Sequence, residues 1–275
     1  MDMFPGEGIG MTKMVRVYIG QQIRKVLPPI LFSAALLGIW QLIISVTDIK
    51  SFLLPSPISV LQTLIEPRWQ WGRQLLTTSM EISGGFALAV FVGISLGVAI
   101  TWSSWTRRSI LPFLVFLNSL PKIALAPLFI VWLGYGVLPN IFIAFISAFF
   151  PIAINTATGI TEIEPDMVDL ARVWQAPQWK VFVKVKIPYA QPYIFTGLKI
   201  ATTMAVIGAI VGEFIASSRG LASVIMNAQA TLATEAILAA LVWIAVLGLA
   251  LYGLVVLIQW LLMPWLHKKR NKEVM

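Results

Sequence analysis

Six stretches of this chain are apolar and long enough to cross the roughly 30 Å hydrocarbon layer of a membrane, which takes about 20 helical residues each. They lie at residues 28–47, 78–102, 110–133, 138–160, 193–215 and 237–263. Hydrophobic residues make up 58% of the 275 residues and charged residues only 12%. A soluble domain carries about 25% charged residues. The sequence therefore predicts an all-α polytopic membrane protein with about six transmembrane helices.

Positive charge gathers in alternate connections between these spans. Fourteen of the 20 Lys and Arg fall in the two terminal tails and in the connections after the second and fourth spans, whereas four fall on the other side. Because Lys and Arg collect in cytoplasmic loops, both termini are expected in the cytoplasm. Residues 1–27 are expected to form a flexible cytoplasmic tail, 28–266 the membrane domain and 267–275 a basic tail. Residues 216–236 are too polar to span and are expected outside, partly re-entrant.

The connection at residues 162–191 is the one long polar interruption, and it has a helical pattern of its own. Pro165 suits a first helical position, and acidic residues near it favour a helix start. An apolar face recurs at helical spacing in Met167, Leu170, Ala171 and Trp174. Pro177 opens a second short helix, which gives a sharp bend near Gln175. Such a knob fits a groove on a soluble partner, or it rests on lipid head groups; periodicity does not choose between these readings.

The motifs of self-sufficient catalysis are missing. The sequence contains no Walker A pattern, no HExxH, no cysteine and no sign of paired carboxylates inside the membrane. The only histidine, His267, falls in the basic C-terminal tail and is expected to be solvated. We therefore expect neither ATP hydrolysis by this chain alone nor metal-dependent hydrolysis, and no enzyme activity.

The third span is the leading candidate for the wall of a transport pathway. Three prolines, including Pro121, remove backbone donors from it and should bend or break the helix. Irregular backbone at membrane depth persists only when buried in protein or lining an aqueous cavity. Asn118 and Ser119 supply polar groups beside the break, and Asn155 on the fourth span is a weaker candidate. Lys122 either reaches an interface or lines the pathway.

The predicted spans also contain two carboxylates and two glycine motifs. Glu81 is expected to be interfacial and solvated. Glu213 is expected to act structurally, by capping a helix or pairing with Arg219, with a place on the pathway as the alternative. The Gly-x-x-x-Gly motifs at residues 93–97 and 208–212 are expected to pack helices within the bundle or across a dimer.

The 162–191 connection resembles the EAA signature of binding-protein-dependent ABC importer permeases, which reads E-A-A, three residues, Gly, nine residues, I-x-L-P. This chain has Asp169-Leu170-Ala171, Gln175 at the glycine position, Val185 at the Ile position, and then Ile187-Pro188. The segments FLLPSPISVLQTL, SLPKIALAPLFIVWLGYG and VGEFIASSRGLASVI resemble the nitrate/sulfonate/taurine branch, which includes pyrimidine-precursor and riboflavin permeases.

The resemblance implies an ABC importer type I permease in a bacterial cytoplasmic membrane. It implies a second, identical permease subunit, two cytoplasmic ATPase subunits that carry the ATP and Mg, and a periplasmic or lipid-anchored binding protein. It implies no cofactor in this chain and no nucleic-acid partner. The loop residues expected at the ATPase contact are Asp169, Leu170, Ala171, Arg172, Trp174, Gln175, Pro177, Ile187 and Pro188. The pathway candidates remain Asn118, Ser119, Pro121, Asn155 and Glu213.

Two alternatives stay open at this level. A stand-alone channel or secondary carrier would give flux without an ATPase, although the spans lack a chain of charged residues for ion coupling. The substrate is also open, and the sparse charge within the spans favours a neutral or aromatic organic solute. Gln175 departs from the signature, because glycine adopts a left-handed turn freely. We expect the turn to be rebuilt around Pro177 rather than strained at Gln175.

Overall fold

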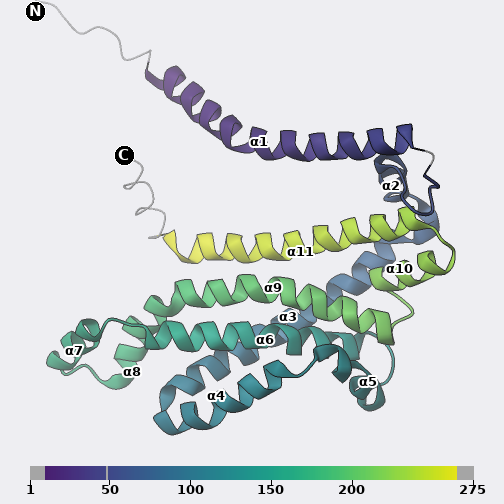
Figure 1. Cartoon of the computed structure of the whole chain (residues 1–275). Helices are drawn as coiled ribbons and strands as arrows, with labels where there is room; N and C mark the ends of the chain where they lie inside the picture. The colour runs from purple at the N-terminus through teal and green to yellow at the C-terminus, as the bar shows by residue number, and fades with distance from the viewer. Residues whose placement is uncertain (1–9, 48, 265–275) are drawn as a thin grey trace, which may run out of the picture.

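The computed structural model describes residues 10–47 and 49–264, and within these residues every regular element is helical (Figure 1). The elements are α1 (Gly10–Val46), α2 (Pro57–Thr63), a 3-10 turn (Pro67–Trp69), α3 (Trp71–Trp102), α4 (Ser104–Ser119), α5 (Lys122–Leu133), α6 (Val137–Thr161), α7 (Pro165–Val173), α8 (Gln178–Val181), a π-helical segment (Phe182–Lys186), α9 (Ile187–Ala216), α10 (Leu221–Ala230) and α11 (Thr234–Leu262).

Five helices among the described residues are long and apolar enough to cross a membrane, and α4 and α5 are so only as a bent pair, which is either a broken span or a re-entrant loop. The break lies between Ser119 and Lys122, where the two helices meet at 93°. Pro121 stands at the break with φ −66° and ψ 105°, extended backbone that starts α5. Five of the six predicted spans are thus confirmed, together with the break that was expected in the third.

Three helices form the core of the bundle, with α6 packed between α3 and α9. Small residues allow the close approach. A Cβ atom at Gly93 would lie 2.8 Å from Ile152 Cβ, and one at Gly97 would lie 2.5 Å from Thr156 Cβ, both on α6. On the other side of α6, a Cβ atom added at Gly208 or Gly212 of α9 would come equally close to backbone and side-chain atoms of α6. Both glycine motifs therefore pack helices within the bundle.

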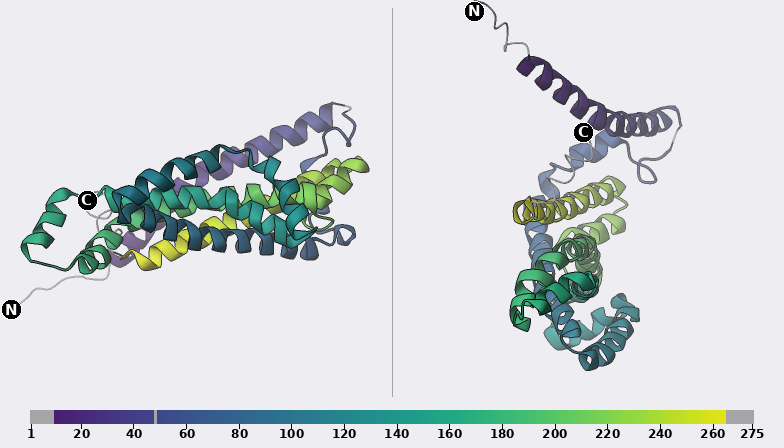
Figure 2. Two further views of the ribbon diagram at one scale, coloured as in Figure 1. Left: turned by 90° about the horizontal axis from the view of Figure 1, so that it is seen from below. Right: turned by 90° about the vertical axis from the view of Figure 1, so that its left-hand side faces the viewer.

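The first helix lies apart from this core. Helix α1 bends near Pro28 and Pro29, and none of its apolar 27–46 stretch is buried (Figures 1 and 2). It is helical from Gly10, so the segment expected as a flexible tail is helical over residues 10–27. Residues 1–9 and the basic tail with His267 lie outside the described residues.

The two ends of the bundle differ. Helices α7 and α8 lie at one end, whereas α2, α5 and α10 gather at the opposite end (Figure 1). Helix α10 has 10 residues and so reaches only about 15 Å, too short to cross a membrane. It packs on α9 and α11, and its residues Leu221, Ala222 and Val224 are buried. The 216–236 connection is thus a folded cap on this end of the bundle.

Candidate functional site

The α7–α8 knob, residues 162–186, continues beyond the end of the bundle along the bundle's long axis (Figures 1 and 2). Its direction carries α7 away from the membrane-spanning part of the chain. The predicted pair of short helices is present, with α7 starting at Pro165 and α8 following Pro177. The helix after the knob starts at Ile187-Pro188, so these two residues join the knob directly to α9.

Apolar side chains of α7 are exposed to a degree that the fold itself does not require. Leu170 is 62% exposed and Trp174 79%, and Met167 on the same face is 47% exposed. Asp169 lies on α7 among them, with an exposed side chain. An exposed apolar face rimmed by charge marks an interaction surface. This face is the docking surface of the knob, defined by Met167, Leu170 and Trp174.

The turn after α7 contradicts the expectation for Gln175. Gln175 has φ +49°, the left-handed conformation, and the surrounding hydrogen bonds are those of an ordinary helix end. Ala176 N–H donates to Ala171 C=O over 3.1 Å, the six-to-one bond of a Schellman motif. The turn keeps the geometry that glycine would give and places the strain, about 1–2 kcal/mol, on Gln175. Pro177 begins α8 and does not rebuild the turn.

The base of the knob is tied to the bundle by an aromatic contact. The ring of Phe182, in the π-helical segment, meets the edge of Trp102 at the end of α3, with 6.0 Å between centroids. The π-helical turn leads into α9 without a break in the chain of helical residues. The knob is therefore joined to α9 by a continuous helical segment and contacts α3 through this ring pair.

The polar groups beside the broken span lie at the α4–α5 corner. Lys122 Nζ donates to Asn118 Oδ1 over 2.9 Å and to Asn118 C=O over 3.0 Å. The ammonium thus caps the carbonyl end of α4, where a positive charge is favoured by the helix dipole. Ser119 donates to Val115 C=O within its own helix and is exposed. This local role is compatible with both readings that the sequence left open for Lys122, an interfacial ammonium and one that lines the pathway.

Asn155 does not join that corner. Its amide donates to Pro151 C=O over 2.8 Å, within α6. Its Cβ faces Gly197 of α9, where an added Cβ would lie 2.9 Å away. The structure therefore places Asn155 at the α6–α9 contact, half-buried, while Asn118, Ser119 and Pro121 lie together at the break.

A buried polar cluster at the opposite end of the bundle joins four helices. Glu213 of α9 is 1% exposed and accepts from Thr78 Oγ1 of α3 and, over 2.7 Å, from Ala222 N–H at the start of α10. Thr78 Oγ1 also accepts from Leu221 N–H over 2.9 Å. Glu213 therefore caps α10, as expected of a structural role. Arg219 is exposed, and no ion pair joins it to Glu213 in the described part of the chain.

Glu81 belongs to the same cluster, which contradicts its expected place at a solvated interface. It is 0% exposed, and its Oε1 accepts from the Asn140 amide of α6 over 2.9 Å. Its carboxyl group also neighbours that of Glu213, so the fold pairs two carboxyl groups inside the membrane domain. No sequence pattern indicates this pair, because the two residues are 132 positions apart.

Comparisons with known proteins agree with the fold. Residues 89–269 match the family described as "Binding-protein-dependent transport system inner membrane component". The formylaminopyrimidine transport permease protein ThiX of Halalkalibacterium halodurans is 30% identical, over 88% of this chain and 97% of the relative. The riboflavin transport system permease protein RibX of Chloroflexus aurantiacus is 33% identical, over 84% of this chain and 87% of the relative.

Two further similarities extend this picture. The putative aliphatic sulfonates transport permease protein SsuC of Bacillus subtilis is 29% identical, over 86% of both chains. Among solved structures, an inward-facing MetNI methionine ABC transporter chain has a TM-score of 0.53 at 16% identity, covering 70% of this chain and 98% of that chain. This last likeness concerns the fold alone, and it agrees with the expected type I importer architecture.

Proposed function

The chain belongs to the family of binding-protein-dependent transport system inner membrane components, a family of ABC transporter permeases and not of enzymes, and we propose that the α7–α8 knob is the part that docks on a separate ATPase. In this proposal the chain forms the substrate pathway of an ATP-driven importer. The ATPase binds ATP and Mg, and its closure moves the knob. The absence of a Walker A pattern from the sequence supports the need for such a partner.

The observation that carries the proposal is the exposed docking surface of the knob. Leu170 and Trp174 remain 62% and 79% exposed although they are apolar. The knob continues along the long axis of the bundle, so this surface lies beyond the end of the bundle and not along its sides (Figure 1). A groove in a soluble partner would bury it, in the manner of a helix docked through residues at i, i+3 and i+7.

The link from the knob to the membrane domain supports a coupling role. Ile187-Pro188 starts α9, and α9 packs along α6 in the core. A push on the knob is therefore passed to a core helix over a short path. Asp169, Ala171, Arg172 and Gln175 stand at the positions that the EAA signature places against the ATPase. Arg172 is suited to pair with a carboxylate of that partner.

The remaining partners and the sidedness complete the proposal. The knob and both termini are cytoplasmic in a bacterial cytoplasmic membrane, as the distribution of Lys and Arg indicates. A second, identical permease subunit completes the pathway, and a periplasmic or lipid-anchored binding protein delivers the substrate from the side of α10. The substrate is a small organic solute or anion, the classes named for the relatives ThiX, RibX and SsuC.

The test is capture of the partner ATPase by the purified permease. Ala171→Asp places a charge directly beside the docking surface, next to Leu170, and we expect it to abolish co-purification of the two proteins. Ala230→Asp is the matched control, because Ala230 is an exposed alanine at the end of α10, at the opposite end of the bundle. If the Ala171→Asp variant captures as much ATPase as the Ala230→Asp variant, the knob is not the docking site.

A further inference from the structure

Two carboxyl groups contact one another inside the buried polar cluster at the α10 end of the bundle. Glu81 of α3 is 0% exposed and Glu213 of α9 is 1% exposed. Their carboxyl groups lie within hydrogen-bonding reach of each other. Two carboxylates that share a site away from water repel one another, so that one of them is neutralised. The pair therefore holds a compensating cation, and the smallest candidate is a proton.

The hydrogen bonds around Glu213 are those of an ionised carboxylate. Its Oε1 accepts from the Thr78 hydroxyl, and its Oε2 accepts from Ala222 N–H over 2.7 Å. Ala222 is the second residue of α10, a helix of 10 residues, and the start of a helix favours a negative charge. Each oxygen of Glu213 thus has its own donor, and the helix dipole adds to their effect.

The hydrogen bonds around Glu81 are those of an acid. Its Oε1 accepts from the Asn140 amide over 2.9 Å, whereas its Oε2 accepts no hydrogen bond from any described residue. A buried carboxylate oxygen without a donor is costly, but a protonated oxygen is itself a donor and needs only an acceptor. Glu213 is an acceptor within reach. The count of donors therefore assigns the proton of the pair to Glu81.

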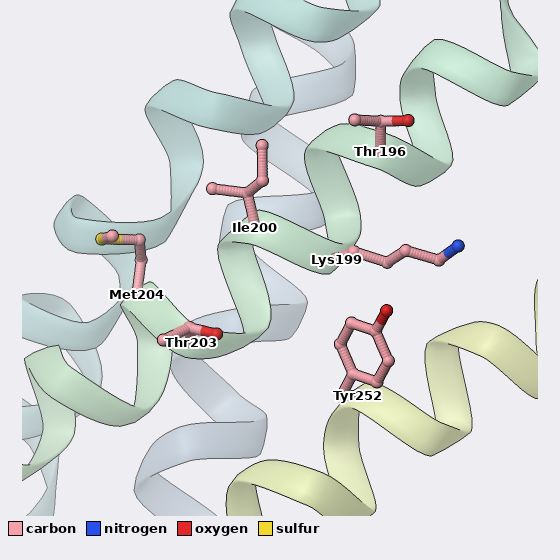
Figure 3. Close-up of a pocket in the computed structure, with 6 residues that line it drawn as sticks. All are labelled: Thr196, Lys199, Ile200, Thr203, Met204 and Tyr252. Atoms are coloured by element: carbon pink, nitrogen blue, oxygen red, sulfur yellow. The ribbon is translucent and has the colours of Figure 1, made fainter.

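No other charge neutralises the pair. Helices α6 and α10, which pack against it, contain no ionisable residue. Lys199 of α9 lies 14 residues from Glu213, about 21 Å along the helix, and lines a separate groove with Tyr252 of α11 (Figure 3). Among the described residues no third acidic or imidazole side chain joins the pair. The other ionisable residues of the neighbouring helices and of the connection before α10 form no ion pair with it in that part of the chain: Arg73, Arg107, Arg108, Lys122, Tyr189, Tyr193, Arg219 and Glu235.

The pair stands where α10 joins the bundle. Three successive backbone N–H groups at the start of α10, those of residues 220–222, donate to side chains of the bundle. Two of them donate to Gln74 and Thr78 of α3, over 2.7 and 2.9 Å, and the third donates to Glu213. Glu81 lies one helical turn after Thr78 on α3. A second negative charge on Glu81 would repel Glu213 from α3, and the start of α10 with it.

We propose that Glu81 and Glu213 form a buried proton-binding site, in which Glu81 keeps its proton at neutral pH and donates it to ionised Glu213, and that this bond latches α10 onto α3. When the proton leaves for water at alkaline pH, two like charges face one another and the α10 end loosens. The pH that acts on the latch is that of the side on which α10 lies, the outside in the sidedness proposed above.

Infrared spectroscopy of the full-length permease, purified in a detergent without ester groups, tests the protonation directly. A glutamate in water is ionised at pH 7, so the C=O stretching band of a protonated carboxyl group reports a buried acid. The proposal predicts such a band in the natural chain, its loss in Glu81→Gln and its retention in Glu66→Gln. Glu66 is the matched control, because it is a partly exposed glutamate outside the cluster.

Thermal unfolding at several pH values tests the linkage of this proton to folding. In the unfolded chain Glu81 meets water and ionises above about pH 4.3, whereas the folded chain keeps the proton. Because the unfolded state then binds fewer protons, the natural chain should lose stability relative to Glu81→Gln as the pH rises from about 5 to 8, by about 3–5 °C in unfolding temperature per pH unit. Glu213→Gln should unfold at a lower temperature than the natural chain at pH 7, because its amide N–H would face a donor.

Amide exchange at residues 221 and 222 tests the latch. The natural chain is compared with Glu81→Gln at the same pH, so that the intrinsic pH dependence of exchange cancels. The two chains should exchange equally at pH 6, and the natural chain should exchange about tenfold faster at pH 10, as for the loss of one buried hydrogen bond.

Three results would overturn the proposal. If Glu81→Gln removes no C=O band, both carboxyl groups are ionised around a larger cation. A difference in unfolding temperature that stays constant between about pH 5 and 8 would mean that folding does not retain the proton. Equal amide exchange in the two chains at pH 10 would mean that the pair does not hold α10. All three measurements use the permease alone, so a failure of the proposed function is seen separately, as a loss of ATPase capture.

Discussion

Replacing Gly220 with alanine tests the buried polar cluster and the cap that α10 forms on the bundle. Gly220 precedes α10 with φ 101° and ψ 173°, a region that only glycine adopts without strain. Any side chain there costs about 1–3 kcal/mol. A Cβ at this position would also overlap the carboxyl group of Glu213. That carboxyl group would have to leave Thr78 or Ala222, and each lost partner in a buried site costs about 1–3 kcal/mol.

Gly134 supplies the matched control for the backbone strain. It has φ 78° and ψ −175°, the same backbone region, but a Cβ there would meet nothing within 4 Å. Gly134→Ala therefore costs only the strain. We expect Gly220→Ala to cost about 2–4 kcal/mol more than Gly134→Ala, because it adds loss of one or two hydrogen bonds.

The assay is thermal unfolding of the purified permease followed by the fluorescence of its 11 tryptophans. The expected difference corresponds to an unfolding temperature roughly 5–10 °C lower for Gly220→Ala than for Gly134→Ala. In a Glu213→Ala background the extra cost of Gly220→Ala should vanish, since the overlapping group is gone. Equal unfolding temperatures for the two glycine variants would refute the reasoning.

Three further predictions concern the knob and the core. Trp174→Ala should weaken ATPase binding by about 10- to 100-fold, as for a hot-spot residue. It should not lower the unfolding temperature, because Trp174 is 79% exposed in the chain. A titration of labelled ATPase measures the binding, and a binding constant equal to that of the natural chain would contradict the prediction. Gln175→Gly should raise the stability of α7 by up to about 1 kcal/mol by releasing the left-handed strain, seen as slower amide exchange in the knob; faster exchange would count against the strain at Gln175. Gly97→Val should destabilise the α3–α6 contact by about 1–3 kcal/mol, because its Cβ would lie 2.5 Å from Thr156 Cβ. Gly38→Ala, where nothing lies within 4 Å, is the control, and equal unfolding temperatures for the two would argue against close packing at Gly97.

The spans and the break in the third span could be predicted from the sequence, because both depend on local chemistry. Apolar length decides whether a helix can cross the membrane. A proline such as Pro121 has no backbone N–H to donate, so it interrupts a helix whatever the rest of the fold. The two short helices of the knob were predictable for the same reason. Their boundaries follow Pro165 and Pro177, which act on the residues next to them.

The buried polar cluster could not be predicted, because its members come from distant segments. Glu213 and Thr78 are 135 positions apart, and Glu81 and Asn140 are 59 apart. A carboxylate near the end of an apolar span is usually solvated. This rule predicts a solvated Glu81, whereas the side chain is buried. Only the packing of α3, α6 and α9 brings an amide to it.

Gln175 shows a different limit. The sequence indicates a turn at this position but not which residue bears its strain. A Schellman turn is stabilised by the hydrogen bond from Ala176 to Ala171, and this bond outweighs the modest preference against glutamine in the left-handed region. The sequence therefore predicts the bend of the knob correctly and its conformation at one residue wrongly.

The most direct test of the central claim is uptake into proteoliposomes that contain this permease, its ATPase and its binding protein, with labelled ethanesulfonate, formylaminopyrimidine and riboflavin as probes. The account predicts accumulation of one of them only when ATP is present on the side of the ATPase and all three proteins are included. It also predicts no accumulation by the Ala171→Asp variant. Accumulation by the permease alone, driven by an ion gradient and without ATP, would contradict the account.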